Sequence, residues 1–356
     1  MDKEKLLITL KNSFLGSLLE DIEITDISYN GDSIYYLHNY LGRQKSQIIV
    51  TEAEVKDFIR QIANLSEKQF SFQNPKLDVS FGKYRINAVH PSIGRKNNER
   101  CLTFSLRIAS DRPIIKNDSN FLNAELVSLF NVLLRSKVSI VIGGITGSGK
   151  TEFQKYLVSS LDNYTRIIII DNVLELDNLS LDNELDINIW QSDENNKEAS
   201  IQELVKNALR SNPDWLIVAE SRGKEMIEVL NSAMTGHPIL TTIHAFDINS
   251  MPTRIARMVM MNEQSQNFDI LLTDIYYNFR FYIYLKREID EKGHVKRFIN
   301  EVAEFDMKGT KTTIYKNEKG KHSFYKVRKE ILPLLKYEND KTFIKTFIRE
   351  DKWIVY

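Results

Sequence analysis

The sequence predicts an α/β protein in which a larger domain with a mainly parallel sheet follows a smaller α+β domain. Between residues 122 and 305, strand-like and helix-like segments alternate, which is typical of a parallel sheet. Residues 1–110 are expected to form the α+β domain, and between residues 22 and 108 they hold several short β-like runs and one clear helical segment. The stretch Asp111–Phe121, DRPIIKNDSNF, mixes Pro, Asp, Asn and Ser and predicts a linker. Residues 306–356 break the alternation and are expected to form a small C-terminal appendage.

Two helices are predicted within residues 1–110. The first 20 residues place leucines and Phe14 at helical spacing, which favours a helix packed on its own domain over the alternative of a helix on a membrane surface. The second helix is expected to begin after Thr51 and to extend to Leu65. The Thr51 hydroxyl can cap its first turn, and the Glu54 side chain, three residues later, can complete a capping box.

Composition narrows the class of protein. Lys+Arg and Asp+Glu both number 48 among 356 residues, so the chain lacks the basic excess of a non-specific nucleic-acid binder. Cys101 is the only cysteine, which excludes an internal disulfide or a multi-cysteine zinc module and suits a reducing cytosol. The N-terminus does not read as a secretory signal, and apolar runs such as Ile167–Ile170 are too short to cross a membrane.

A phosphate-binding loop is predicted at Gly144–Thr151, GITGSGKT, between an apolar strand and a helix. Its glycines let successive backbone N–H groups face phosphates at the positive end of the following helix. Lys150 is expected to neutralise the β- and γ-phosphates, and the Thr151 hydroxyl to ligate Mg²⁺. The other predicted nucleotide-binding residues of this P-loop domain, which we expect to be RecA-like, are Gly144, Thr146, Gly147, Ser148 and Gly149.

A second catalytic element is predicted at Pro213–Glu220, PDWLIVAE. Glu220 ends an apolar strand, and ligands of open α/β sheets bind beyond the carboxyl ends of the strands. There, Glu220 would polarise the attacking water or hold the magnesium shell. The alternative interpretation is a surface glutamate that simply follows a strand.

Two histidines, His237 and His244, flank the next apolar strand in GHPILTTIHAFD. An imidazole beside a nucleotide site can hydrogen-bond the γ-phosphate and respond to its loss. A packed or surface role is the alternative for each histidine. A metal site is disfavoured because neither cysteines nor an H-E-x-x-H pattern accompanies them.

Taken together, these segments resemble the secretion (traffic) ATPase superfamily of type II and type IV secretion, conjugation and pilus assembly. The resemblance rests on four segments in this order: the P-loop GITGSGKT, the acidic box IIDNVLEL, the Walker B segment PDWLIVAESRG and the histidine box TGHPILTTIHA. ITDISYNGDSIYYLHNYLGR and PKLDVSFGKYRINAVHPSIG look like the N-terminal domain of the branch that serves tight-adherence pili and conjugative type IV secretion. The resemblance extends over roughly residues 20 to 305.

By that resemblance, Lys150 and Thr151 match the P-loop pair, Glu220 the Walker B glutamate and a magnesium ligand, and His244 the γ-phosphate-sensing histidine. Glu175 matches the catalytic acid of the acidic box. The family's N-terminal domain supplies arginines to the nucleotide, often across a subunit boundary, and the positions that match are Arg85, Arg107 and, more weakly, Arg95. A solvated or salt-bridged arginine is the alternative for each, and Arg210 and Arg222 beside Walker B are further candidates.

Three departures from the family pattern concern the details of the site. The acidic box carries Asp171 and Asn172 where the branch has Glu-Asp, which puts magnesium coordination in doubt rather than activity. Ala219 replaces a glycine of Walker B. The spacing of His237 and His244 is closer to the pilus-motor and type II branches than to the branch that the N-terminal domain resembles.

The resemblance implies a Mg-ATP-hydrolysing motor that forms a homo-oligomeric ring, which we expect to be a hexamer. It would lie on the cytoplasmic face of the membrane, with inner-membrane platform or channel proteins as partners and no direct nucleic-acid binding. The alternatives are a nucleic-acid motor and an ATP-binding scaffold that does not hydrolyse. The transported substrate is not specified by the sequence.

Overall fold

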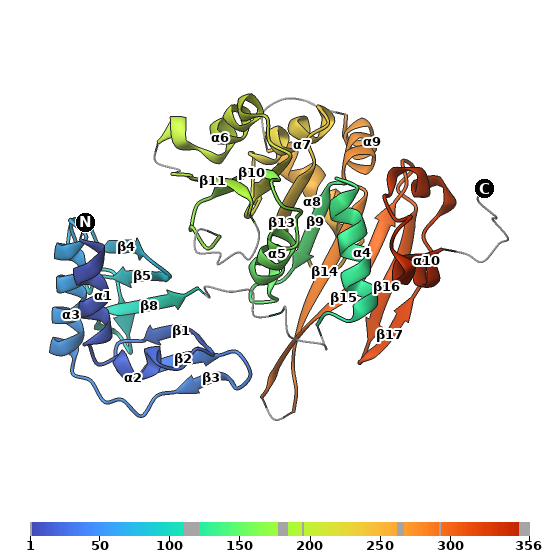
Figure 1. Cartoon of the computed structure of the whole chain (residues 1–356). Coiled ribbons are helices and arrows are strands. Elements are labelled where there is room, and N and C mark those ends of the chain that lie inside the picture. Colours follow the sequence, from blue (N-terminus) through green and yellow to red (C-terminus); the bar gives the residue numbers. More distant parts are fainter. Residues whose placement is uncertain are drawn as a thin grey trace. The chain divides into compact units, whose positions relative to one another are not determined.

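A computed structural model describes residues 2–109, 115, 121–176, 184–193, 196–261, 267–291 and 293–348 (Figure 1). The chain divides into two compact units, Met1–Asp111 with Glu288–Lys296, and Arg112–Arg287 with Arg297–Tyr356. Most of the predicted linker, Asp111–Phe121, lies outside the described residues. Its described members, Ile115 and Phe121, are buried in the core of the second unit.

The first unit contains an antiparallel six-stranded sheet in the order β3-β2-β1-β8-β5-β4. Its strands are β1 (Ile24–Tyr29), β2 (Ile34–His38), β3 (Gly42–Lys45), β4 (Lys76–Phe81), β5 (Tyr84–Val89) and β8 (Thr103–Ile108). A separate small hairpin pairs β6 (Arg95–Lys96) with β7 (Glu99–Arg100). Its helices are α1 (Lys3–Lys11), α2 (Gly16–Leu19) and α3 (Glu52–Leu65).

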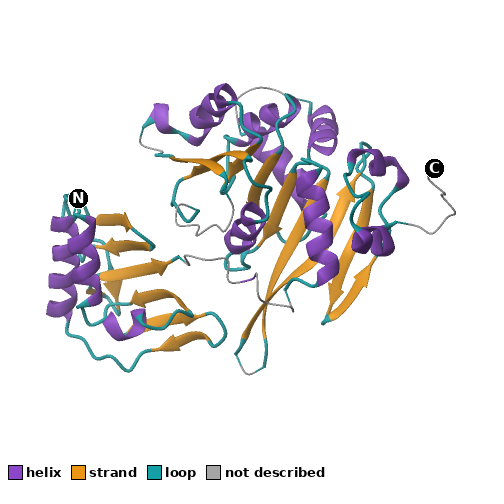
Figure 2. Cartoon of the chain, in the orientation of Figure 1, coloured by secondary structure: helices purple, strands orange, loops and turns teal. Residues whose placement is uncertain are grey.

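The helices of this unit cover one face of its sheet (Figure 2). The predicted capping box of α3 is confirmed, since Thr51 Oγ1 accepts the Glu54 N–H while the Glu54 carboxylate accepts the Thr51 N–H. The predicted N-terminal helix is present as two shorter ones, and Leu6, Leu10 and Leu15 from this stripe are fully buried. These leucines pack into the same core as the inward residues of the strands, so this apolar stripe belongs to the core of its own unit, as predicted.

The second unit is built on a sheet whose described strands follow the order β11-β10-β12-β13-β9-β14-β15-β16-β17. The strands from β11 to β14 in this order pair in parallel, and β15, β16 and β17 extend the sheet through antiparallel pairs. The parallel strands are β9 (Ile140–Gly144), β10 (Arg166–Asp171), β11 (Asp186–Gln191), β12 (Trp215–Val218), β13 (Ile239–His244) and β14 (Phe281–Ile289). The others are β15 (Val295–Phe305), β16 (Lys311–Glu318) and β17 (Lys321–Phe324). The mixed α/β fold with a mainly parallel sheet confirms the predicted fold class.

Helices lie on both faces of this sheet (Figures 1 and 2). One core contains residues of α4 (Ala124–Arg135), α5 (Lys150–Ser159) and α10 (Lys341–Phe347). The other contains residues of α6 (Ile201–Ala208), α7 (Met226–Met234), α8 (Ser250–Val259) and α9 (Phe268–Asn278). Short 3-10 helices are η2 (Lys197–Ala199), η3 (Leu209–Ser211) and η4 (Lys329–Leu334). Because both faces are covered, β9, β10, β12 and β13 are almost continuous runs of buried, mostly apolar residues, whereas the edge strand β11 is only half-buried.

Apolar residues between positions 314 and 347 share a core with the P-loop helix. Phe343 and Phe347 of α10 are fully buried in the cluster that also holds Phe153 of α5. Asp340 caps α10 and accepts a hydrogen bond from Ser128 of α4 at 2.6 Å. The C-terminal strands and α10 are thus packed into the second unit.

An internal ion cluster fixes this C-terminal part. The carboxylate of Glu304 on β15 is fully buried and is paired with the Arg328 guanidinium, whose Nη1 also lies 3.0 Å from Asp306. A buried carboxylate needs such a partner, because desolvation strongly disfavours an isolated charge. Arg328 therefore joins the segment after β17 to the strand β15.

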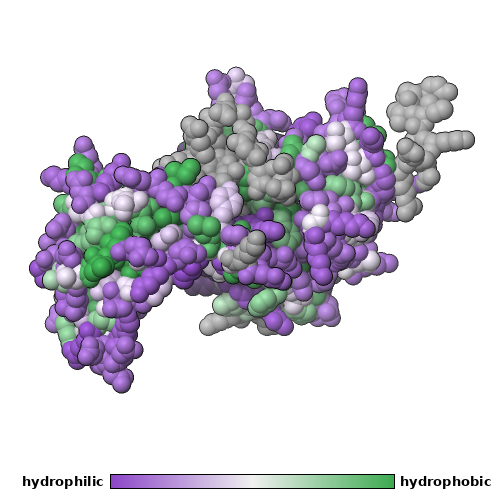
Figure 3. All heavy atoms as spheres, turned by 90° about the horizontal axis from the view of Figure 1, so that it is seen from below, coloured by the Kyte–Doolittle hydropathy of each residue, from purple (hydrophilic) through white to green (hydrophobic). Residues whose placement is uncertain are grey.

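The surface seen from below is mostly hydrophilic, and its apolar groups gather mainly over part of the first unit, at the left of the view (Figure 3). Within the described residues, no helix is both long enough and apolar enough to span a bilayer.

Candidate active site

The predicted phosphate loop connects the carboxyl end of β9 to the first residue of α5, Lys150. Gly147 and Gly149 have φ values of +74° and +94°, which residues with a Cβ rarely adopt. Gly149 is the N-cap of α5, and no side chain caps the helix there. The first-turn amides of α5 thus remain for a ligand at the positive end of the helix.

Close packing shapes the base of the loop at Gly144 and Ser148. A Cβ on Gly144 would lie 2.4 Å from Ser148 Oγ and 2.7 Å from the Leu285 carbonyl oxygen of β14. Ser148 is fully buried, and within the described residues its hydroxyl has no hydrogen-bond partner. A buried hydroxyl without a protein partner in an amide-lined loop fits a phosphate chain.

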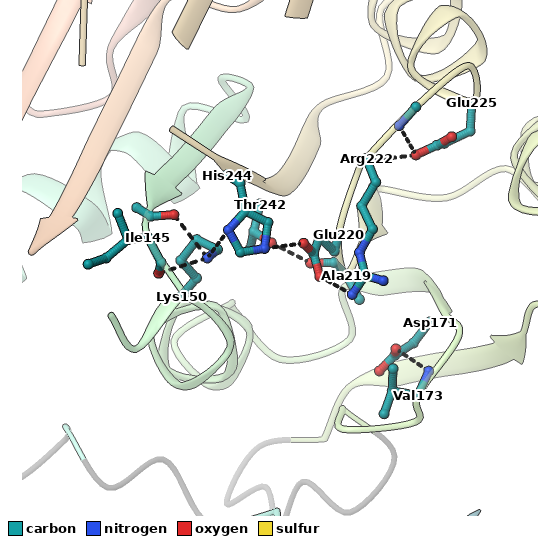
Figure 4. A network of polar contacts seen from close by, with 12 residues as sticks. Ile145, Lys150, Asp171, Val173, Ala219, Glu220, Arg222, Glu225, Thr242 and His244 are labelled. Carbon is teal, nitrogen blue, oxygen red and sulfur yellow. Dashed lines mark hydrogen bonds and ion pairs between the residues drawn. The ribbon is translucent and has the colours of Figure 1, made fainter. Parts of the chain in front are cut away.

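Lys150 is 8% exposed and folds back over its own loop. Its Nζ donates hydrogen bonds to the carbonyl oxygens of Gly144 and Ile145 at 3.1 and 3.2 Å. It also lies 3.5 Å from Nδ1 of His244 (Figure 4). The ammonium group is therefore already held at the end of β9, where the loop would receive phosphates.

His244 joins Lys150 to Glu220. Its other ring nitrogen, Nε2, lies 2.7 Å from Oε1 of Glu220, and Oε2 of Glu220 lies 2.6 Å from Nη2 of Arg222. Figure 4 shows these four side chains in one row, contributed by the P-loop helix, β13 and the segment after β12. The structure thus brings together Lys150, Glu220 and His244, as the sequence predicted for an ATP site, and it also places the candidate Arg222 beside Glu220.

The charges in this row determine the protonation of its members. Burial raises the pKa of Glu220, but Arg222, His244 and Lys150 outweigh this effect and bring the pKa below its usual value. Burial and the cations Lys150 and Arg222 lower the pKa of His244, against the opposing effect of Glu220. At neutral pH the arrangement is a glutamate anion beside a neutral imidazole, suited to accept a proton or orient water.

Strand pairing determines these positions. β12 and β13 are adjacent and parallel, so Glu220 and His244 emerge at the same edge of the sheet as the P-loop. Thr242 Oγ1 donates a 2.8 Å hydrogen bond to the Ala219 carbonyl, directly before Glu220. The buried Gln154 of α5 donates to the carbonyls of Val218 and Leu240, which links the P-loop helix to both strands.

Thr151 lies half-buried in the first turn of α5, beside Lys150. A hydroxyl at this position can ligate Mg²⁺ that is bound to the phosphates. The loop residues Ile145, Thr146 and Gly147 are exposed, so the predicted nucleotide-binding segment is open to a ligand. The residues present therefore fit Mg-ATP.

The acidic box contributes two carboxylates, Asp171 and Glu175, whose surroundings differ. Asp171 ends β10 and is 3% exposed, and its carboxylate accepts the N–H groups of Val173 at 2.9 Å and Leu176 at 3.2 Å. Burial raises the pKa of Asp171 despite these hydrogen bonds. Glu175 is half-buried in the turn that follows. The carboxylate of Asp171 thus holds this turn through backbone hydrogen bonds. Glu175 is therefore the carboxylate of the acidic box that we expect to act on the nucleotide.

The predicted arginines of the N-terminal domain lie in the first unit. Arg85 on β5 forms a two-point ion pair with Asp78 of β4, at 3.1 and 2.8 Å. Arg107 on β8 is the direct cross-strand neighbour of both Arg85 and Asp26. These two arginines share the sheet face that the helices leave uncovered, whereas Arg95 lies in the separate small hairpin. Their roles toward the nucleotide stay predictions.

Two candidates lie away from the carboxyl edge of the parallel sheet. His237 precedes β13, at the opposite end from His244, and contacts Thr235 Oγ1 at 3.1 Å. Arg210 is exposed in η3, before the amino end of β12. Because a parallel strand places its two ends at opposite edges of the sheet, neither side chain belongs to the row of Figure 4.

Two arginines beside the P-loop were not predicted. Arg297 on β15 donates from Nε to the Gly147 carbonyl at 2.8 Å. Arg287 on β14 has Nη1 3.7 Å from the position of a Cβ on Gly147, and within the described residues its buried Nε has no hydrogen-bond partner. Both lie in basic segments, KRE and VKRF, but nothing local in the sequence places these segments beside the P-loop.

Comparison with known proteins identifies the family. The family model described as "Type II/IV secretion system protein" matches residues 98–351, more than half of the chain. The chain belongs to the type II/IV secretion system protein family. An uncharacterised Bacillus anthracis protein is 31% identical over 320 residues, which cover 85% of this chain and 70% of that protein.

Relatives with known roles are secretion and pilus proteins. The type IV secretion system protein VirB11 of Bartonella quintana is 27% identical over 211 residues, 57% of this chain and 55% of VirB11. The Legionella pneumophila ATPase DotB superposes with a TM-score of 0.63 at 20% identity, over 82% of this chain and 80% of DotB. The pilus retraction motor PilT with bound ADP gives 0.56 at 19% identity, over 81% of this chain and 82% of PilT. These two structures share the fold of this family member.

Proposed function

We propose that this secretion-system family member hydrolyses Mg-ATP and works as a ring-forming motor of a secretion, conjugation or pilus-assembly machine. The observation that carries the proposal is the contact row Lys150–His244–Glu220 at the carboxyl edge of the sheet, directly beside an amide-lined loop. A cation for phosphates and a carboxylate for water lie on either side of one imidazole. Such positioning and charge stabilisation supply most of the catalysis in phosphoryl transfer.

Lys150 exchanges its two carbonyl partners for phosphate oxygens when the loop binds the nucleotide. The amides around Gly147 and Ser148 and the first turn of α5 hold the phosphate chain, and Thr151 ligates the metal. When bound, Mg²⁺ neutralises part of the phosphate charge. Glu220 orients the attacking water, and His244, in contact with both Lys150 and Glu220, responds to the γ-phosphate and its loss.

Arg85 and Arg107 are proposed to reach the nucleotide of a neighbouring subunit and to stabilise the charge that develops on the phosphoryl group. A trans arginine restricts fast hydrolysis to the assembled ring, which we expect to be a hexamer. We place this ring on the cytoplasmic face of the membrane, with membrane-embedded proteins of the machine as partners. The similarity to the type IV secretion system protein VirB11 supports a role in such a machine.

The second candidate is an ATP-binding scaffold that does not hydrolyse. The hydrogen bonds of Asp171 favour it, because the loop amides occupy the one acidic-box carboxylate at the end of β10. Under this alternative the P-loop and Lys150 would still bind ATP.

Phosphate release from Mg-ATP over a protein-concentration series separates the two functions. The motor predicts activity that rises cooperatively with protein concentration and is lost in Lys150→Ala and Glu220→Gln, while Glu220→Gln still binds ATP. The control is His237→Ala, at the other end of β13. Wild-type protein that binds ATP at every concentration without releasing phosphate would overturn autonomous hydrolysis.

A further inference from the structure

The C-terminal part of the second unit has a charge unlike that of the rest of the chain. Residues 307–348 contain ten lysines and one arginine against four carboxylates, a net charge of +7, in a chain whose net charge is zero. A neutral total thus conceals one strongly basic segment. Charge on this scale attracts an anionic surface over about 8 to 10 Å at physiological salt.

Ion pairs inside the molecule consume only part of this charge. Arg328 is paired with Glu304 and Asp306, Lys311 with Glu301, and Lys316 with Glu318. By contrast, Lys336, Lys341 and Lys345 are exposed, and within the described residues none of the three forms an ion pair. Their positive charge is directed to solvent.

Exposed apolar side chains alternate with these lysines. On α10, Ile344 is 39% exposed between Lys341 and Lys345. Leu334 at the end of η4 is 44% exposed two residues before Lys336, and Tyr325 is 47% exposed next to Lys326. Lysine beside isolated apolar and tyrosine side chains is typical of surfaces that lie on a membrane, where the cations meet headgroups and the apolar groups enter the interface.

Hydrogen bonds join the segment after β17 to α10, which carries Lys341, Ile344 and Lys345. Lys326 Nζ donates to the Lys345 carbonyl at 3.0 Å, and the Val327 N–H donates to the Phe347 carbonyl at 2.8 Å. α10 is anchored below by the fully buried Phe343 and Phe347. The exposed side of α10 and the segment 325–336 therefore belong to one packed layer, the C-terminal basic surface.

We propose that this C-terminal basic surface binds the headgroups of an anionic phospholipid bilayer. Charge complementarity and the interleaved apolar groups favour this occupant over nucleic acid. Lysines also protect an edge strand from pairing, as on β17, but the lysines of α10 and of residue 336 lie outside the strand edge. The inference deepens the proposed function by assigning the membrane-facing surface of the motor, and lipid binding does not depend on hydrolysis.

The test is co-sedimentation of full-length protein with vesicles of phosphatidylglycerol and phosphatidylcholine, or of phosphatidylcholine alone. Binding is measured at about 50 mM salt, where charges attract over a long distance, and at about 500 mM salt, where the attraction is largely screened. We expect binding to the anionic vesicles at low salt only. The variant Lys336→Gln, Lys341→Gln, Lys345→Gln should bind about 100-fold more weakly, since each lysine near an anionic surface contributes roughly fivefold. The matched control Lys3→Gln, Lys11→Gln, Lys76→Gln loses the same charge from exposed sites of the first unit and should bind as wild type.

Thermal unfolding and phosphate release are measured on both variants, and neither should change. Equal vesicle binding by the two variants, or binding unaffected by phosphatidylglycerol, would overturn the proposal. So would a triple variant that loses single-stranded oligonucleotide binding but retains vesicle binding. Wild-type protein that binds the anionic vesicles but releases no phosphate from Mg-ATP would instead overturn autonomous hydrolysis and leave this surface assignment standing.

Discussion

The imidazole of His244 touches Glu220 through Nε2, at 2.7 Å, and faces the Lys150 ammonium through Nδ1, at 3.5 Å. One ring thus separates the group proposed to bind phosphate from the group proposed to orient water. A shift of Lys150 or of Glu220 therefore alters a contact of the His244 ring. This relationship makes His244 the most informative residue to substitute.

We expect His244→Ala to lower kcat about 100-fold, because misplacement of a catalytic group by about 1 Å costs that much. The side-chain amide of Gln can replace Nε2 of the ring, and that of Asn can replace Nδ1. If the Glu220 contact matters, His244→Gln should retain more activity than His244→Asn. Steady-state phosphate release and equilibrium ATP binding measure this, and equal activity of all three variants and wild type would contradict it.

Gly144→Ala tests the packing at the base of the P-loop. The added methyl would collide with Ser148 Oγ and with the Leu285 carbonyl, and the backbone carbonyl cannot move aside without shifting β14. We expect ATP binding to be lost and the protein to be destabilised by about 1 to 3 kcal/mol, as in other overpacked sites. Gly320→Ala is the control, since nothing lies within 4 Å of its Cβ and only its φ of +86° is strained. Thermal unfolding and ATP titration compare the two.

Arg297→Ala should weaken ATP binding about tenfold, because the loop loses a charge-assisted hydrogen bond to the Gly147 carbonyl. Arg297→Lys keeps the charge without the planar guanidinium and should recover only part of the affinity. Arg280→Ala, which removes an arginine stacked on Tyr277, serves as the control in the same unit. Isothermal titration with ATP checks the order wild type, Lys, Ala, and an unchanged affinity in Arg297→Ala would show that the contact is dispensable.

Arg328→Leu should destabilise the protein by about 3 to 5 kcal/mol, because it leaves the Glu304 carboxylate buried without a counter-charge. The double variant Arg328→Leu, Glu304→Gln removes that isolated charge and should regain a large part of the loss. Urea unfolding of the two single variants and the double variant measures the coupling. Additive effects would mean that the pair contributes nothing as a pair.

Local sequence patterns accounted for the catalytic edge of the sheet. The glycine-rich loop, the apolar strand before Glu220 and the strand before His244 each have a direction, and parallel strands bring their carboxyl ends to one edge. The same reasoning applied to His237 would have separated it from His244, because the two residues lie at opposite ends of β13. Strand direction was therefore sufficient for the row Lys150–His244–Glu220.

Arg287 and Arg297 could not be found in that way. Arg297 meets Gly147 across 150 positions of sequence, and the contact exists because β14 pairs with β9 next to the P-loop. Neither residue lies in a motif, and no local pattern fixes which strand will neighbour β9. The hydrogen bonds of Asp171 were likewise beyond prediction, because they depend on how the turn after β10 folds over the carboxylate.

The place of β9 in the sheet has a mechanical consequence. β9 is the middle strand, with β11, β10, β12 and β13 on one side and β14, β15, β16 and β17 on the other. A nucleotide that displaces β9 would therefore also displace β13 and β14, its hydrogen-bonded neighbours on the two sides. The proposed turnover would in this way move both halves of the sheet.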